Sequence, residues 1–163
     1  MITDEIKAKL IEWMTNFVEV PNPNLGDWAP CPYAKQARLR DKISIRFTDN
    51  IIAEARSCLA DLILKDVVVI CFDHTKISAK QLEYVVDTLN AELMPDDFVI
   101  LEDHPDIPES INGVPMNFGH CGLLVIQKMS KLKTASDQLK EKGYYDVWSQ
   151  EDIDFVVSWR DNG

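Results

Sequence analysis

Residues 67–72, VVVICF, form a continuous apolar run, and this run is the sequence feature that most constrains the fold. Such a run is typical of a strand that is covered on both faces. The apolar residues that follow recur at helical spacing behind a capping box of Ser78 and Gln81; they are Leu82, Val85, Val86, Leu89 and Leu93. A buried strand followed by an amphipathic helix predicts an α/β fold.

The later part of the chain continues the alternation of strand and helix. The predicted elements are, in order, a strand at 98–103, a strand at 122–128, a helix at 130–142 that ends at Gly143, and a strand at 144–148. From Val67 onward the predicted order is therefore βαββαβ, which is the order of the ferredoxin-like fold. The segment 152–160, DIDFVVSWR, fits either a strand or a short helix.

Further elements precede this core. In chain order they are a helix from Thr3 to Val18, the connection PNPNLGDWAPCP at 21–32, a short strand at 42–47 and a helix at 52–63. Four prolines among the twelve residues of the connection exclude regular helix and central strand. We predict a single α/β domain over 1–163, with the N-terminal helix and proline-rich connection at 1–42 and the sheet core at 43–163.

Charge and composition restrict the possible partners. The chain has 27 acidic and 17 basic residues, for a net charge of −10, so nucleic acid and anionic membranes are repelled. No apolar stretch approaches the roughly 18 residues that a membrane span needs, and the N-terminus lacks the pattern of a secretory signal. We expect a cytoplasmic protein with reduced cysteines that binds a small molecule or another protein and neither nucleic acid nor a membrane.

Two Asp-His pairs stand where predicted strands end. Asp73-His74 follows the strand at 67–72, and Asp103-His104 ends the strand at 98–103. A single helix between the two strands makes them parallel in a right-handed crossover, so both histidines reach the same edge of the sheet. We expect them to share a site. The alternative is that each histidine only bonds a loop carbonyl at its strand end.

Cys31 is the best candidate nucleophile. Pro32 fits the first position of a helix with Cys31 as its cap, where the helix dipole favours a thiolate. Lys35 and Arg38 lie close behind in the sequence and would favour a thiolate further. The alternative is that Cys31 is a small buried residue that locks a proline-rich turn.

The residue types Cys31, His74 and His104 allow two kinds of enzyme site. One is a thiolate aided by imidazole acid-base chemistry, and the other is a zinc or iron site. Asp73 and Asp103 are candidate ligands or groups that orient the imidazoles. His120 and Cys121 are further candidates, although neighbouring side chains on an extended segment point to opposite faces.

A loop of about 18 residues, from His104 to Cys121, is too long to be an ordinary connection. It contains three prolines and two glycines, and its acidic residues make it negative. We interpret it as a lid or binding loop whose acidic rim is either simply solvated or recognises a cationic group. A non-catalytic binding module of ferredoxin-like fold, which holds a ligand or a protein on this loop, is therefore the alternative to an enzyme.

Other notable residues fit packing roles. Cys58 and Cys71 lie in apolar patterns and are expected in the core. Four aromatic residues near turns either pack together or line a ligand pocket; they are Trp28, Tyr144, Tyr145 and Trp148.

Residues 31–34, Cys-Pro-Tyr-Ala, are similar to the glutaredoxin motif with its second cysteine replaced by alanine. The order of elements, together with these residues, His74 and His104-Pro105, also resembles an uncharacterised family of small bacterial proteins with a Leu-Cys-Pro-Phe-Ala motif and two His-Pro dipeptides. In this chain, Tyr33 replaces the phenylalanine of the family motif, and Thr75 replaces the proline of the first His-Pro dipeptide. The resemblance implies one site built from Cys31, His74 and His104, and it names no reaction.

Overall fold

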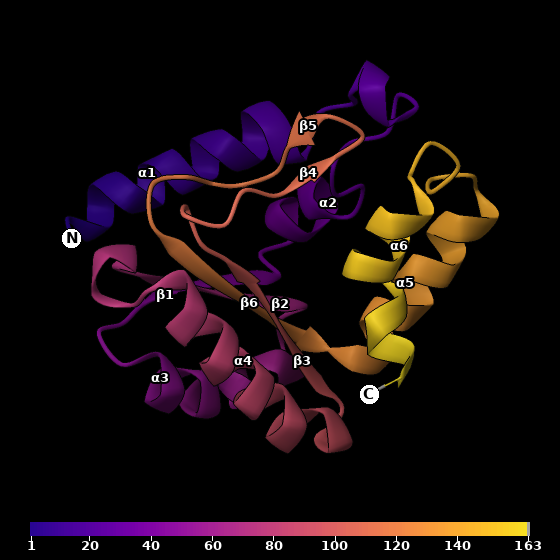
Figure 1. Cartoon of the computed structure of the whole chain (residues 1–163). Helices are drawn as coiled ribbons and strands as arrows, with labels where there is room; N and C mark the ends of the chain where they lie inside the picture. The colour runs from indigo at the N-terminus through magenta and orange to yellow at the C-terminus, as the bar shows by residue number, and fades with distance from the viewer. Residues whose placement is uncertain (163) are drawn as a thin grey trace.

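A four-stranded mixed sheet forms the centre of the computed structural model, which describes residues 1–162 (Figure 1). The strands lie in the order β1-β2-β6-β3; they are β1 (Ile43–Phe47), β2 (Val67–Phe72), β6 (Gly122–Lys128) and β3 (Phe98–Asp103). β1 pairs parallel with β2, whereas β6 is antiparallel to both β2 and β3. The parallel strands β2 and β3 therefore end at the same edge of the sheet, with β6 between them.

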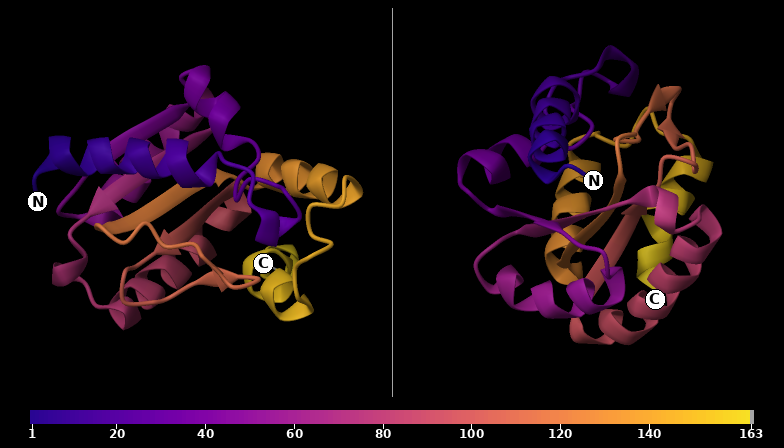
Figure 2. Two further views of the ribbon diagram at one scale, coloured as in Figure 1. Left: turned by 90° about the horizontal axis from the view of Figure 1, so that it is seen from above. Right: turned by 90° about the vertical axis from the view of Figure 1, so that its left-hand side faces the viewer.

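Helices cover both faces of the sheet (Figure 2). One face is covered by α3 (Ile51–Ser57), which continues as a 3-10 turn to Ile63, and by α4 (Ala79–Leu93). The other face is covered by α1 (Thr3–Trp13), which is followed by a π-helical turn at Met14–Val18. The remaining helices are α2 (Ala34–Leu39), α5 (Met129–Glu141) and α6 (Gln150–Val156).

Alternation along β2 explains why its sequence is apolar throughout. Val68, Ile70 and Phe72 pack against α3 and α4, whereas Val69 and Cys71 pack beneath α1. Both sets are buried, as the continuous run predicted. The capping box of Ser78 and Gln81 at the start of α4 is also confirmed.

A third, smaller apolar cluster joins parts of the chain that are distant in sequence. Leu25 of the proline-rich connection is fully buried against Ile111 and Val114. These two belong to a short hairpin, β4 (Ser110–Ile111) and β5 (Val114–Pro115), inside the long loop. Partly buried residues of the N-terminal segment, the long loop and the C-terminal segment complete the cluster; they are Phe17, Met116, Trp148 and Val156.

The predicted strand at 144–148 is wrong, because these residues form turns. Gly143 adopts a left-handed conformation with φ 88° and ends α5, and the rings of Tyr144, Tyr145 and Trp148 then pack on one another. The place beside β2 is taken by β1, which is parallel to it. The segment 152–160 is helical, in α6 and in a 3-10 turn at Ser158–Asn162.

The remaining strand predictions are confirmed, at Ile43–Phe47, Phe98–Asp103 and Gly122–Lys128. Over residues 1–162, no helix combines the length and the apolar character that crossing a membrane requires.

Candidate functional site

His74 and His104 meet where β2 and β3 end. Their ring centroids are 5.8 Å apart, with one ring edge facing the other, although β6 separates the two strands in the sheet. His74 is half-buried and begins a 3-10 turn that Asp73 caps. Asp73 accepts hydrogen bonds from the amide and hydroxyl of Thr75, which lower the pKa of its carboxyl. Asp73 is therefore occupied in capping this turn.

The imidazole of His104 is buried and both of its nitrogens are bonded. Nε2 lies 2.7 Å from the carbonyl oxygen of Ile77, and the amide of Asp106 donates to Nδ1 at 3.1 Å. A carbonyl requires a donor at Nε2 and an amide requires an acceptor at Nδ1, so these partners assign the neutral tautomer. No ring nitrogen remains for a metal or a substrate, and the geometry matches the alternative of a strand-end residue bonded to a loop.

We expect His104→Ala to lower the free energy of unfolding by about 3 kcal/mol, because the change leaves a cavity and two partly buried backbone groups without partners. Urea denaturation followed by circular dichroism measures this difference. His120→Ala is the matched control, since His120 is exposed and only stacks on Phe118, and it should change stability by less than about 0.5 kcal/mol. Equal effects of the two changes would contradict a structural role for His104.

The long loop is held in place by Asp103 and Asn117. Asn117 donates to Asp103 Oδ1 at 2.7 Å and to the carbonyl oxygen of Ile107 at 3.0 Å, and the Phe118 amide donates to Asp103 Oδ2 at 2.9 Å. At the hairpin tip, the side chain of Asn112 donates to the carbonyl oxygen of Asn24. These contacts, together with the packing of Ile111 and Val114 on Leu25, fix the loop against the rest of the fold.

Two glutamates beside this loop have strongly raised pKa values. Burial raises the pKa of Glu102 to about 7, helped by the charges of Asp87 and Glu83 on α4. Burial likewise raises the pKa of Glu109 to about 7, helped by Asp103 and Glu102. We call these five residues the acidic cluster. Their joint arrangement was missed in the sequence, because Glu83 and Asp87 are distant along the chain and only the packing of α4 against β3 brings them close.

Few contacts within the protein neutralise the negative charge of the acidic cluster. One carboxylate oxygen of Glu102, Oε2, is buried and has no hydrogen-bond partner among the described residues. Over residues 1–162, no lysine or arginine forms an ion pair with Glu102, Asp103 or Glu109. His104 offers the cluster no compensating bond, because both of its ring nitrogens are already bonded to the backbone.

Cys31 lies in a bend before α2 and does not cap it. The helix begins at Ala34 with Tyr33 as its N-cap residue, so the predicted cap is wrong. Arg38 is bonded through two nitrogens to the buried carboxylate of Glu19, at 2.7 and 2.9 Å. Although Cys31 has exposed surface, desolvation by the surrounding atoms raises the pKa of its thiol, opposed by the amides of Tyr33 and Ala34 and reinforced by Glu19. The surroundings of Cys31 therefore do not favour the thiolate that the sequence predicted.

The surroundings of Cys31 differ from those of the histidines. Its amide donates to the carbonyl oxygen of Val18, and the hydroxyl of Tyr144 donates to the carbonyl oxygen of the preceding residue, Pro30. Cys31 therefore lies beside the aromatic cluster that follows α5. Lys35 is exposed. Over residues 1–162, no three His, Cys, Asp or Glu side chains gather as a metal-binding group. The expected zinc or iron site of Cys31, His74 and His104 is therefore not assembled.

His120 and Cys121 point to opposite sides of the segment before β6, as expected for neighbouring residues. His120 is exposed on the ring of Phe118, with ring centroids 5.1 Å apart. Cys121 is buried and interacts with Cys71. The sequence did not indicate this thiol pair, because it depends on the register of β2 against β6.

No protein family, curated protein or solved structure matches the chain.

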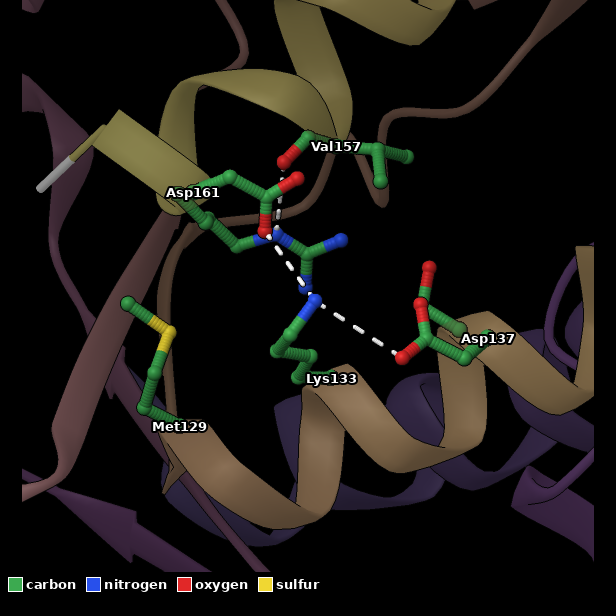
Figure 3. A pocket seen from close by; sticks show the side chains of 7 residues that line it. Met129, Lys133, Asp137, Val157 and Asp161 are labelled. Atoms are coloured by element: carbon green, nitrogen blue, oxygen red, sulfur yellow. Dashed lines mark hydrogen bonds and ion pairs between the residues drawn. The ribbon is translucent and has the colours of Figure 1, made fainter.

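Neither histidine lines the two cavities described next. One, of about 280 Å³, lies between α5 and the C-terminal turn, where Lys133 pairs with Asp137 and Asp161 at 3.7 and 3.6 Å (Figure 3). Arg160 lines the same cavity, and burial lowers its pKa. A second, more open groove lies between the first turns of α3 and α4 and includes Lys76 and Lys80.

Proposed function

We propose that this protein is a non-catalytic binding module whose acidic cluster binds a cationic group, an amine or a guanidinium, of a partner. The observation that carries the proposal is the carboxylate of Glu102, whose oxygen Oε2 is buried and has no hydrogen-bond partner among the described residues. The raised pKa values of Glu102 and Glu109 support the proposal. A bound cation would satisfy these carboxylates and relieve their mutual repulsion.

The rest of the molecule supports the binding of a cation. The net charge of −10 attracts cationic partners over distance and speeds their association. The cluster stands on β3 and α4 and on a loop that Asn117 fixes, so it is preorganised. We also propose that β2, α4, β3 and β6 represent part of a ferredoxin-like unit, with β1 added at the edge where a fourth strand would lie.

The enzyme expected from the sequence has less support. That enzyme needs the thiol of Cys31 beside the imidazoles of His74 and His104. Both nitrogens of His104 are bonded to the backbone, and burial raises the pKa of Cys31.

Calorimetric titration with a hexa-arginine peptide tests the proposal. A raised carboxyl pKa means that Glu102 and Glu109 are largely protonated below neutral pH and carry their charge only above it. We therefore expect the peptide to bind more tightly at about pH 8 than at about pH 6, by roughly tenfold, and to release protons when it binds near neutral pH. A peptide of six glutamines should not bind at either pH.

Single charge removals locate the site. Glu102→Gln and Glu109→Gln should each weaken peptide binding about threefold to tenfold, whereas Glu151→Gln, at an exposed position on α6, should change it by less than about twofold. If all three changes weaken binding equally, the peptide senses only the net charge and the proposed site is rejected. The proposed site is also rejected if the affinity for the peptide does not rise with pH.

A further inference from the structure

Two thiols face each other inside the core. In the register of β2 and β6, Cys71 lies opposite Leu123 and Phe72 lies opposite Gly122. Cys121 comes two residues before Leu123, so it lies diagonally from Cys71 on the same face of the sheet. A small movement of the strands brings the sulfur atoms of such diagonal neighbours together.

The pair is enclosed and separate from the other cysteines. Cys71 and Cys121 are 0% and 1% exposed, in the apolar cluster beneath α1 that includes Leu10, Met14 and Phe118. Cys58 belongs to the cluster on the opposite face of the sheet, and Cys31 lies at the surface. Because the pair is enclosed, an oxidant reaches it only through local opening of the core, which favours a small neutral molecule over a peptide or a bulky disulfide.

We propose that Cys71 and Cys121 form a redox-active dithiol, which a hydroperoxide such as hydrogen peroxide converts into a disulfide between β2 and the start of β6. In the first step, the thiolate sulfur of Cys121 attacks one peroxide oxygen, the O–O bond breaks, and water leaves with the thiol proton, which yields a sulfenic acid. In the second step, the sulfur of Cys71 attacks that sulfenic sulfur, the S–O bond breaks, and a second water leaves with the proton of Cys71. Two thiols are oxidised and one peroxide is reduced to two waters.

The direct interaction of the two side chains determines which sulfur reacts first. The neighbouring side chain of Cys71 lowers the pKa of Cys121, burial opposes this effect, and the amide of Phe72 again lowers the pKa. The same interaction, together with burial, raises the pKa of Cys71. Cys121 is therefore the attacking thiolate, and Cys71 resolves the sulfenic acid.

The geometry also makes the disulfide easily reduced. Diagonal strand neighbours have Cα atoms about 7–8 Å apart, beyond the range of an unstrained disulfide. Closing the bond therefore requires the strands to shift and places strain in the sheet. Strained disulfides are the reducible ones, so the pair is suited to reversible oxidation.

The test uses the double variant Cys31→Ser and Cys58→Ser, which keeps only the proposed pair. After exposure of the folded protein to hydrogen peroxide, we expect the intact mass to fall by two hydrogen atoms, with a peptide that links Cys71 to Cys121, and dithiothreitol should reverse both changes. Cys71→Ser in the same background should instead gain oxygen at Cys121, and dimedone should trap it as the sulfenic acid.

Other results would overturn the proposal. The folded protein is treated with peroxide at a concentration that fully oxidises Cys31 in the unmodified chain, and it is then unfolded and alkylated. The proposal fails if both thiols of the pair still react with the alkylating reagent. It also fails if the linked peptide forms only when urea is present during oxidation. Should Cys71→Ser not fold, as judged by circular dichroism, Cys71→Ala provides the same comparison with an apolar side chain.

Discussion

Gly122→Ala is expected to lower the free energy of unfolding by about 3 kcal/mol, because it adds a methyl group where no space exists. A Cβ atom at Gly122 would lie 2.2 Å from the ring of Phe72, its partner on β2. The ring is 1% exposed and is enclosed by the core beneath α3 and α4, so it cannot turn away without disturbing its neighbours. Urea denaturation measures the change, and the slope of the transition shows whether the native state stays compact.

A double-mutant cycle separates this clash from other effects. Phe72→Leu alone should cost about 1 kcal/mol through lost packing, and it also removes the ring atoms that the new methyl group would meet. The double variant should therefore be more stable than the sum of the two single changes predicts, by about 1 kcal/mol or more. Additive effects would show that the close approach of Gly122 and Phe72 does not limit the residue at position 122.

Asn90→Ala is expected to lower the free energy of unfolding by a similar amount, about 3 kcal/mol. Asn90 on α4 is buried, and its side chain both accepts from the amide of Ile100 at 2.8 Å and donates to its carbonyl oxygen at 3.0 Å. Ile100 lies on β3, an edge strand, so these two bonds replace those of a missing neighbouring strand. Alanine would leave two buried backbone groups without partners.

Thr88→Ala on the same helix is the control for this change. Thr88 is exposed and bonds only the carbonyl oxygen of Tyr84 within the helix, so its replacement should cost less than about 0.5 kcal/mol. Hydrogen exchange adds a local readout, because Asn90→Ala should accelerate exchange of the Ile100 amide while the amides of β2 remain protected. Unchanged exchange at Ile100 would contradict the proposed replacement of strand bonds.

Much of the fold follows from local sequence pattern. The apolar run at 67–72 and the capping box at Ser78 each depend on residues close in sequence, and both are confirmed. The strand predicted at 144–148 is wrong because its aromatic residues pack on distant partners. Tyr144, for example, packs on Trp28 with ring centroids 5.7 Å apart. Residues that pack on one another and on distant segments need not extend into a strand.

The site was predictable only where topology determines it. The proximity of His74 and His104 follows from two parallel strands joined by one helix, and the rings are indeed in contact. The position of Cys31 depends on how the proline-rich connection packs on α5, seen in the bond from Tyr33 to Gln138, 105 residues away. The acidic cluster and the thiol pair likewise arise from tertiary packing and strand register, which a single sequence does not reveal.

The position of β6 between β2 and β3 has a consequence for the order of folding during synthesis. When the ribosome has released the chain through β3, that strand has no partner, because its hydrogen bonds go to residues 122–128. Until then, only β1 and β2 can pair, and the apolar face of α4 has half a sheet to cover. The sheet closes when the last strand inserts at its centre, so completion of the core waits for late contacts between residues distant in the chain.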